Sequence, residues 1–331
     1  MKIGITYDLR SEYLKMGYSE EETAEFDKED TIEAIDRALQ NAGYRTDRIG
    51  HSRNLMKRLL IGDKWDLIFN ICEGFFGDGR ESLVPALLDS FRIPYVFSGP
   101  ATLAVTLNKY MTKRLVRDAG VPTPDFVLIQ SEEDLSNHKL AFPLFAKPVS
   151  EGTGKGIDHH SVIYSEQQFR EVCRQLLNKF NQPVLVEEFL PGREFTIGVI
   201  GNGRKAQVIG AVEVIFNDKE SKIYSYENKE NWVDRIKYRK VSVSTMKACE
   251  SIALKVWEVT GALDAGRIDL KEDKHGKLQF IEINPLAGIN PHHSDLPILA
   301  GLYDLNYQEL IERIMKAAIN RIFGNEGGHS T

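Results

Sequence analysis

The hydrophobic positions along this chain follow two spacings, one typical of strands and one typical of helices. The run Ile3 to Tyr7 is short and apolar, as in a buried strand, whereas Thr31 to Ala42 is apolar at helical spacing and stops at Gly43. The pattern continues with a strand at 44–49, a helix at 55–61 and a strand at 65–71. This alternation favours a parallel, doubly wound sheet. The acidic stretch Ser11 to Asp30 predicts a flexible or capping segment.

Beyond residue 100 the predicted elements no longer alternate so simply. The expected helices are 108–117, 166–180, 245–260 and 305–322, and the expected strands are 142–147, 184–190, 195–200 and 207–215. Pro122-Thr-Pro124 indicates a domain linker, and Asn202-Gly203 indicates a hairpin turn. Residues 217–240 lack a clear period and predict a long surface loop, and residues 323–331 predict a frayed tail.

Two strands near the C-terminal end carry polar residues on one face. Alternate residues of a strand share a face, so Arg267 and Asp269 point the same way. On the return strand the residues expected to share a face are Phe280, Glu282 and Asn284, with Ile281 and Ile283 pointing away. A two-residue turn at His275-Gly276 would place Asp269 opposite Glu282, and Arg267 opposite Asn284. A four-residue loop would also keep the two carboxylates on one face, whereas a three-residue loop would not.

The convergence of two carboxylates on this hairpin points to a metal. Carboxylates that face each other across strands normally destabilise a hairpin. Divalent cations between Asp269, Glu282 and Asn284 would remove that cost, and oxygen ligands of this type suit magnesium. A solvated strand face is the alternative interpretation.

A loop with three glycines follows a strand that ends in Lys147. Gly152, Gly154 and Gly156 would let the backbone approach phosphate oxygens and donate N–H groups to them, while Lys147 would neutralise phosphate charge. The spacing is neither that of a Walker A loop nor that of a Rossmann fingerprint, and a flexible hairpin loop is the alternative. A second glycine-rich loop, 72–79, follows the strand 65–71, at the edge where parallel sheets bind ligands.

Composition excludes several classes of protein. The chain has 331 residues, 42% of them hydrophobic and 27% charged, which suits a soluble protein of two or three domains. Its net charge of −6 gives no reason to expect nucleic acid or an anionic membrane as a partner, and no apolar run approaches the roughly 20 residues that span a membrane. Three cysteines without metal-type spacing and the absence of a signal peptide indicate the cytoplasm. His292 and His293 lack a third spaced ligand, so we expect no zinc site.

Taken in chain order, these motifs resemble the ATP-grasp superfamily, and more closely the D-alanine–D-alanine ligase family. The segments that carry the resemblance are Pro148-Val-Ser-Glu-Gly-Thr-Gly-Lys-Gly156, Val186-Glu-Glu-Phe-Leu-Pro-Gly-Arg-Glu-Phe-Thr196, Arg267-Ile-Asp269 and Glu282-Ile-Asn-Pro285. With the helical Lys109 before them, they follow the family's order from about residue 65 to about residue 310.

The resemblance implies an α/β fold, α+β in part, in which ATP lies between two antiparallel sheets. We expect an N-terminal parallel-sheet domain over residues 1–108, a central lid domain over 109–192, and a C-terminal domain with the metal and catalytic residues over 193–331. The loop 150–156 and the segment 217–240 would close over the site and keep water out. A homodimer is the default expectation for assembly.

The resemblance also implies a role for each matching residue. ATP would be held by Lys109, Lys147, Ser150, Gly152, Thr153, Gly154, Gly156, Glu187, Glu188, Phe189, Leu190 and Glu194. Asp269, Glu282 and Asn284 would hold two magnesium ions, for which manganese could substitute. Arg267 and the N–H of Gly288 would stabilise negative charge at the reacting acyl centre, and Lys229 would reach the γ-phosphate. Ser294 and Leu296 would bind the carboxylate of the acceptor.

The implied activity is an ATP-dependent ligation of two amino acids, such as the D-alanyl-D-alanine used in peptidoglycan synthesis. ATP would convert a carboxylate to an acyl phosphate, which an amine then attacks, and charge neutralisation would do most of the catalysis. One alternative is the same chemistry on another amino acid, hydroxy acid or peptide. A second alternative is a catalytically silent ATP-binding protein.

Four regions depart from the family pattern and concern the substrate. The family's Gly-Gly-x-Ser-x-Glu segment, whose glutamate binds the first D-alanine, is absent from Asp8 to Asp30, where Glu25 or Glu29 could replace it. The loop 70–81 reads Asn-Ile-Cys-Glu-Gly-Phe-Phe-Gly-Asp-Gly-Arg-Glu in place of a His-Gly-x-x-Gly-Glu-Asp-Gly motif. The acceptor loop 287–297 is about one residue longer, with Asp295 between Ser294 and Leu296, and Glu230 stands where D-alanine enzymes have tyrosine. D-alanine specificity therefore does not follow from the resemblance.

Overall fold

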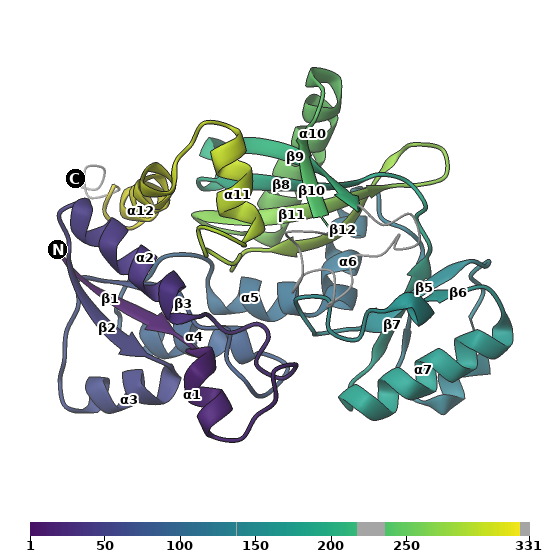
Figure 1. Ribbon diagram of the computed structural model, residues 1–331, viewed down its shortest axis with the longest axis horizontal. Coiled ribbons are helices and arrows are strands. Elements are labelled where there is room, and N and C mark those ends of the chain that lie inside the picture. The colour runs from purple at the N-terminus through teal and green to yellow at the C-terminus, as the bar shows by residue number, and fades with distance from the viewer. Residues whose placement is uncertain (137, 217–235, 325–331) are drawn as a thin grey trace, which may run out of the picture.

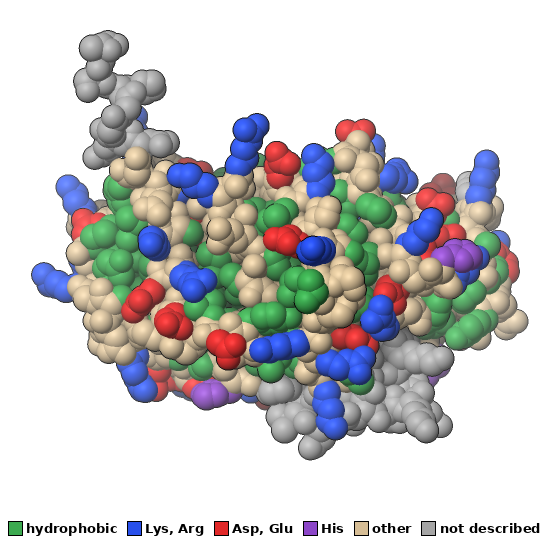
Figure 2. All heavy atoms as spheres, turned by 90° about the horizontal axis from the view of Figure 1, so that it is seen from above, with side chains coloured by type: hydrophobic (Ala, Val, Ile, Leu, Met, Phe, Trp, Pro, Cys, Tyr) green, Lys and Arg blue, Asp and Glu red, His purple; other side chains and the backbone are tan. Residues whose placement is uncertain are grey.

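The computed structural model describes residues 1–136, 138–216 and 236–324, and its strands form three sheets (Figure 1). The described part of the chain contains no helix that is long and apolar enough to cross a membrane. On the face shown in Figure 2, acidic and basic side chains are interspersed rather than gathered by sign.

The N-terminal sheet is parallel, as the sequence predicts. Its strands are β1 (Lys2–Tyr7), β2 (Arg45–Gly50) and β3 (Leu67–Ile71), in the order β2-β1-β3. The helices of this region are α1 (Arg10–Lys15), α2 (Glu29–Asn41), α3 (Ser52–Leu60), α4 (Leu83–Ser90) and α5 (Pro100–Leu107), with the short 3-10 helix η1 (Arg80–Ser82). Ile32, Ile35 and Leu39 of α2 are buried against Ile3 and Ile5 of β1. The predicted helical spacing therefore buries one face of α2 on the sheet.

The last helix, α12 (Tyr307–Phe323), joins the N-terminal core. Its buried residues Ile311 and Ile314 belong to the same hydrophobic cluster as Ile3 and Ile35, so α12 lies beside the N-terminal sheet and α2 (Figure 1). Asn306 caps this helix by accepting the N–H of Glu309, whose side chain bonds back to the N–H of Asn306. The cap fixes where α12 begins.

The central sheet is antiparallel and has the order β4-β7-β5-β6. Its strands are β4 (Phe126–Ile129), β5 (Leu144–Pro148), β6 (Val162–Ile163) and β7 (Val184–Glu188), with α6 (Lys109–Asp118) before them. Helix α7 (Glu166–Phe180) covers one face and buries Phe169, Val172 and Leu176. Two 3-10 helices, η2 (Glu132–Ser136) and η3 (His159–Ser161), lie in its connections.

The third sheet is antiparallel, with the order β10-β9-β8-β11-β12. Its strands are β8 (Glu194–Ile200), β9 (Gln207–Phe216), β10 (Ile236–Lys240), β11 (Ala265–Glu272) and β12 (Leu278–Asn284), with η4 (Gly203–Lys205) in one turn. Helix α10 (Val243–Thr260), which was expected over 245–260, packs on this sheet through Cys249, Ala253 and Val256 and ends at Gly261 in the left-handed conformation. Helix α11 (Asp295–Leu302) also contacts β8 and β9.

Three predicted loops are partly wrong. Residues 236–240 are the edge strand β10 rather than loop, while 217–235 lie outside the described residues. The stretch Ser11 to Asp30 includes most of α1 and the start of α2, and α11 begins at Asp295 inside the expected acceptor loop. All three segments are too polar or too short for the spacing of their hydrophobic residues to predict a helix or strand. Their structure is decided by strand pairing and by packing against the rest of the chain.

The polar hairpin has the predicted register but not the predicted turn. Asp269 pairs with Glu282 and Arg267 pairs with Asn284. The loop is three residues long, because the N–H of Asp273 bonds to the carbonyl of Lys277, and Gly276 supplies a positive φ of 75°. Such a loop alone would put the carboxylates on opposite faces. A bulge at Ile281 restores the register, since Leu270 pairs with Phe280 while Asp269 pairs with Glu282.

The bulge also corrects the predicted strand faces. Phe280 is fully buried in the core beneath α10, although it was expected beside Glu282. Ile281, which was expected to point away, lines a cavity together with Glu282. The inserted residue therefore brings one apolar and two acidic side chains to the same cavity.

Candidate active site

Two adjoining cavities lie between the central sheet, the five-stranded sheet and the N-terminal region. The larger has a volume of about 200 Å³ and the smaller about 100 Å³. They share the lining residues Lys109, Glu151, Gly152, Thr153 and Glu282. Lys109 and Glu282 come from α6 and β12, and their charged groups are 3.8 Å apart. Molecules held in the two cavities would therefore meet at this ion pair.

The smaller cavity collects most of the residues expected to hold ATP. These are Lys109, Lys147, Gly152, Thr153, Gly154, Glu187, Glu188, Phe189, Leu190 and Glu194, together with Asp269 and Glu282. Its apolar lining comes from Phe145, Ile157 and Ile281. An apolar lining combined with lysines and carboxylates suits a molecule that has a flat ring and a phosphate tail.

A buried chain of three charges holds one wall of the smaller cavity. The carboxylate of Glu187 lies 2.7 Å from Lys113 and 2.8 Å from Lys147, and all three side chains are buried. Burial opposes the charge on Lys113 and lowers its pKa to about 8, although Glu187 works against this. For Lys147 and Glu187 burial is outweighed, so the pKa of Lys147 is raised and that of Glu187 is lowered. The sequence motifs did not identify Lys113 as a residue of the site.

The expected metal ligands converge as the register requires. Asp269 lies opposite Glu282, and the amide nitrogen of Asn284 is 3.5 Å from a carboxylate oxygen of each. Thr196 donates a hydrogen bond of 2.9 Å to Asp269 and orients it. Among the described residues no three His, Cys, Asp or Glu are grouped as metal ligands, so a third oxygen ligand here requires the Asn284 amide to turn its oxygen toward the carboxylates. Two carboxylates and an amide fit a hard divalent cation, and they are the oxygen donors that magnesium takes.

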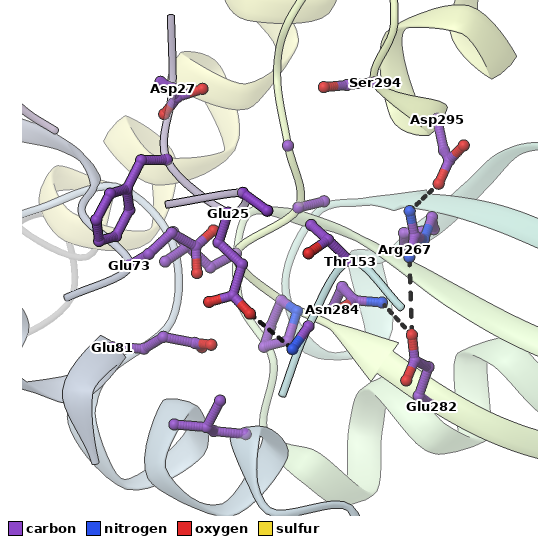
Figure 3. A pocket seen from close by; sticks show the side chains of 18 of the residues that line it. Glu25, Asp27, Glu73, Glu81, Thr153, Arg267, Glu282, Asn284, Ser294 and Asp295 are labelled. Carbon is purple, nitrogen blue, oxygen red and sulfur yellow. Dashed lines mark hydrogen bonds and ion pairs between the residues drawn. The ribbon is translucent and has the colours of Figure 1, made fainter. Parts of the chain in front are cut away.

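Arg267 lies between these carboxylates and Asp295. Its guanidinium is 3.0 Å from Asp269. It is also 3.9 Å from Glu282 and forms an ion pair with Asp295 (Figure 3). Asp295 is buried at the start of α11 and accepts a hydrogen bond of 2.5 Å from Tyr238. The sequence alone marks Asp295 only as the extra residue of the acceptor loop. The structure makes it the partner of the predicted catalytic arginine.

Glu25 reaches the glycine loop from the N-terminal region. It accepts the N–H of Gly152 at 2.7 Å and pairs with Arg80 at 2.8 Å, while Arg80 also donates to the carbonyl of Ser150. Burial opposes ionisation of Glu25, but Arg80, Lys155 and the N–H of Gly152 lower its pKa to about 2. Glu29 instead pairs with Arg48 at the exposed surface. Of the two candidate glutamates, only Glu25 lines a described cavity.

The remaining predicted residues are distributed unevenly. Gly288 and Ser294 line the larger cavity. They pack closely, because a Cβ atom added at Gly288 would lie only 2.8 Å from the hydroxyl oxygen of Ser294. The side chain of Leu296 is buried in the core and lines neither cavity. Gly156 packs against Pro148 rather than facing either cavity. Lys229 lies outside the described residues.

Comparison with known proteins places this geometry in a family. A family model described as D-ala D-ala ligase C-terminus matches residues 115–316. The chain belongs to the D-alanine–D-alanine ligase family. The D-alanine–D-alanine ligase of Aquifex aeolicus is 31% identical over 287 residues, which cover 86% of this chain and 93% of that protein. The uncharacterized protein y4sG of Sinorhizobium fredii is 28% identical over 315 residues, 88% of each chain.

Solved structures of the family share the fold. The D-alanine–D-alanine ligase from Bacillus anthracis complexed with ATP has a TM-score of 0.75 and 18% identity, and the match covers 97% of this chain and 98% of that chain. VanG D-Ala:D-Ser ligase from Enterococcus faecalis has a TM-score of 0.72 and 17% identity, over 96% of this chain and 99% of that one. The fold is therefore of ATP-grasp type, with an N-terminal parallel sheet and two antiparallel sheets.

Proposed function

We propose that this chain is an ATP- and Mg²⁺-dependent ligase that joins a carboxylate to an amine through an acyl phosphate and releases ADP and phosphate. The adjoining cavities carry the proposal, because they share Lys109 and Glu282 where a γ-phosphate would meet a substrate carboxylate. The smaller cavity would hold ATP, and the larger would hold the two substrates. The relative from Bacillus anthracis, which was solved with ATP, supports this assignment.

Each charged side chain then has a chemical task. Lys109 and Lys147 would bind phosphate oxygens, and Glu187 would keep Lys147 in place through their 2.8 Å ion pair. Asp269, Glu282 and Asn284 would hold Mg²⁺, which when bound neutralises charge on the transferring phosphoryl group. Arg267 and the N–H of Gly288 would face the oxyanion formed when the amine attacks. The buried hydroxyl of Thr153 has no hydrogen-bond partner among the described residues, as expected for a group that a ligand completes.

The substrate is the open part of the proposal. D-alanine on both sides is the first pair to test, because relatives of this chain carry that activity in their names. Two contacts favour a different pair of substrates: the ion pair between Asp295 and Arg267, and the hydrogen bond from the N–H of Gly152 to Glu25. Each of them places a carboxylate of the chain itself in the substrate cavity. The same acyl-phosphate chemistry would serve another amino acid, hydroxy acid or peptide.

Phosphate release tests the function. The protein is incubated with ATP, Mg²⁺ or Mn²⁺, and pairs drawn from D- and L-amino acids, hydroxy acids and short peptides, and products are identified by mass spectrometry. We expect release that requires a carboxylate and an amine together and is absent from Glu282→Gln. Intact ATP with every pair would contradict the ligase assignment and favour a silent nucleotide-binding protein.

A further inference from the structure

A carboxylate of the chain itself lies where the larger cavity meets the start of α11. Asp295 is the first residue of that helix and lines the cavity, yet its side chain is buried. It forms an ion pair with Arg267 of β11 and accepts a hydrogen bond of 2.5 Å from the Tyr238 hydroxyl of β10. Figure 3 shows Asp295 reaching Arg267 from one side, with Glu282 on the other. Two strands and one helix therefore hold the ion pair in place.

The positive charge of Arg267 is more than balanced by the carboxylates around it. Besides Asp295, its guanidinium lies 3.0 Å from Asp269 and 3.9 Å from Glu282. Mg²⁺ bound to Asp269 and Glu282 would neutralise those two groups and leave Asp295 as the partner of the arginine. In neither state does this site present a net positive charge to the cavity. A substrate carboxylate placed beside it would lack the counter-charge that a buried anion requires.

The loop that leads into α11 uses several of its backbone N–H groups internally. The N–H groups of His292 and His293 donate to the side-chain oxygen of Asn290, at 2.9 and 3.3 Å. The N–H of Asn290 donates to the Ser294 hydroxyl at 3.0 Å. The side-chain nitrogen of Asn290 donates to Thr31 of α2 at 2.9 Å and so ties the loop to the N-terminal region. These three N–H groups therefore point into the loop and not toward a substrate carboxylate.

The N-terminal end of α11 is also occupied by a charge of the chain. Helix N-termini attract anions, because their first N–H groups are unpaired and the helix dipole is positive there. Asp295 places its carboxylate in the first turn of α11, and the side chain of Leu296 is buried in the core. A substrate carboxylate at this helix end would lie close to that of Asp295, and like charges repel. The helix end therefore disfavours a second carboxylate.

The other cations that line the larger cavity are Arg10, Lys28 and Lys109. Arg10 pairs with Glu20 at 2.5 Å, and Lys109 lies 3.8 Å from Glu282 at the junction of the two cavities. Lys28 is exposed before α2, where water screens its charge. Each lining cation that is shielded from solvent thus already has a carboxylate beside it.

We propose that Asp295 determines the acceptor: the amine that attacks the acyl phosphate carries no free carboxylate beside its reacting nitrogen, as in a simple amine or an amino-acid amide. The inference rests on the proposed ligase function and narrows its substrate class. The uncharged amine attacks the acyl carbon, the bond from that carbon to the phosphate oxygen breaks with its electron pair leaving on phosphate, and the nitrogen loses a proton to give the amide. Asp295 takes no part in these bond changes. It acts through Arg267 and through its own charge.

Acceptors that differ in the carboxylate test the inference by turnover, with the donor found in the phosphate-release screen held constant. Alanine is compared with ethylamine and alaninamide, and phenylalanine with phenethylamine and phenylalaninamide, using both enantiomers where they exist. The simple amines are more basic than the amino acids, so a preference for them does not come from a larger fraction of uncharged nitrogen. We expect at least a tenfold higher kcat/KM for a carboxylate-free compound than for its amino acid. Equal or better use of the amino acids would overturn the inference and leave the ligase function standing.

The variant Asp295→Asn separates specificity from a structural role. It keeps the side-chain volume, and Arg267 retains Asp269 and Glu282 as counter-charges, so the variant should fold. We expect the ratio of kcat/KM between simple amine and amino acid to fall at least tenfold, chiefly through a lower KM for the amino acid, and a general loss of activity cancels in this ratio. Asp304→Asn, the same change at a side chain that is 96% exposed, is the matched control and should keep the wild-type ratio. An unchanged ratio in Asp295→Asn would contradict the role of Asp295.

A binding measurement gives an answer that does not depend on turnover. Thermal midpoints of the wild type and of Asp295→Asn are recorded with ADP and Mg²⁺ while each amino acid or simple amine is added. We expect the amino acids to raise the midpoint of the variant more than that of the wild type, and the simple amines to give no such gain. Equal responses of both proteins to the amino acids would contradict the inference even if the protein is a ligase. Intact ATP with every donor and acceptor would instead contradict the proposed function.

Discussion

Lys113 provides a quantitative test of how the smaller cavity is held together. Its ammonium is fully buried and contacts Glu187 at 2.7 Å, the Thr123 hydroxyl at 2.8 Å and the carbonyl of Phe280 at 3.3 Å. Lys113→Met keeps most of the side-chain volume and removes the charge. Glu187 would then retain Lys147, 2.8 Å away, as its counter-charge.

The expected cost follows from this arrangement. Removing one partner of a buried ion pair lowers the free energy of unfolding by about 3–5 kcal/mol. Because Lys147 still pairs with Glu187, we expect a loss at the low end of this range, about 3 kcal/mol. With about 2 °C per kcal/mol for a large chain, the thermal midpoint should fall by about 6 °C. Glu187 would lose one of two cations, so its pKa should rise, and Lys147 should be held less firmly. We therefore also expect a higher KM for ATP.

The assay is thermal unfolding of the full chain, followed by circular dichroism, with ATP kinetics in parallel. Arg114→Met, an exposed change one position along α6, is the matched control and should alter stability by about 1 kcal/mol or less. The double variant Lys113→Met/Glu187→Gln should lose less stability than the sum of the single changes, because the uncompensated carboxylate is gone. Equal midpoints for Lys113→Met and Arg114→Met would refute this account of the wall.

Three further predictions follow from the site. Glu282→Gln should abolish ADP formation while leaving the circular dichroism spectrum and thermal midpoint near those of the wild type; near-normal turnover would remove the metal assignment. Gly156→Ala should destabilise the loop by roughly 1–3 kcal/mol, because φ is +72° and the new methyl would lie 2.6 Å from Pro148, whereas Gly62→Ala, with φ +88° and nothing within 4 Å, should cost about 1 kcal/mol. Glu81 has its pKa raised from 4.5 to about 7, so the folded state binds an extra proton between these values, and the wild type should lose stability relative to Glu81→Gln as the pH rises from about 5 to about 8. Thermal midpoints of both proteins across that range measure the difference, and parallel curves would show that Glu81 titrates normally.

The sequence predicted the polar hairpin because its signal is local. Alternation of faces with a two-residue turn predicts Asp269 opposite Glu282, and the structure has that pairing through a three-residue loop and a bulge. The bulge at Ile281 was not predictable from the pattern, since it depends on Phe280 entering the core beneath α10. The register prediction was therefore right although the turn was wrong.

The missed residues depend on contacts between distant segments. Glu25 and Gly152 are 127 positions apart, and Arg267 and Asp295 are 28 apart. Nothing in the neighbourhood of Glu25 distinguishes it from Glu29, and only the packing of the N-terminal segment on the glycine loop does so. Lys113 looked like one of several basic residues on an amphipathic helix, although its place on the buried face of α6, four positions after Lys109, was an available signal.

The central claim is that the chain activates a carboxylate by phosphorylating it, and transfer of isotope tests this most directly. A substrate found active in the phosphate-release screen is labelled with ¹⁸O in its carboxylate and incubated with ATP, Mg²⁺ and the amine partner. An acyl phosphate requires that one labelled oxygen appear in inorganic phosphate for each amide formed, and that the variant Glu282→Gln produce neither. Amide formation or ATP consumption with unlabelled phosphate would contradict the mechanism.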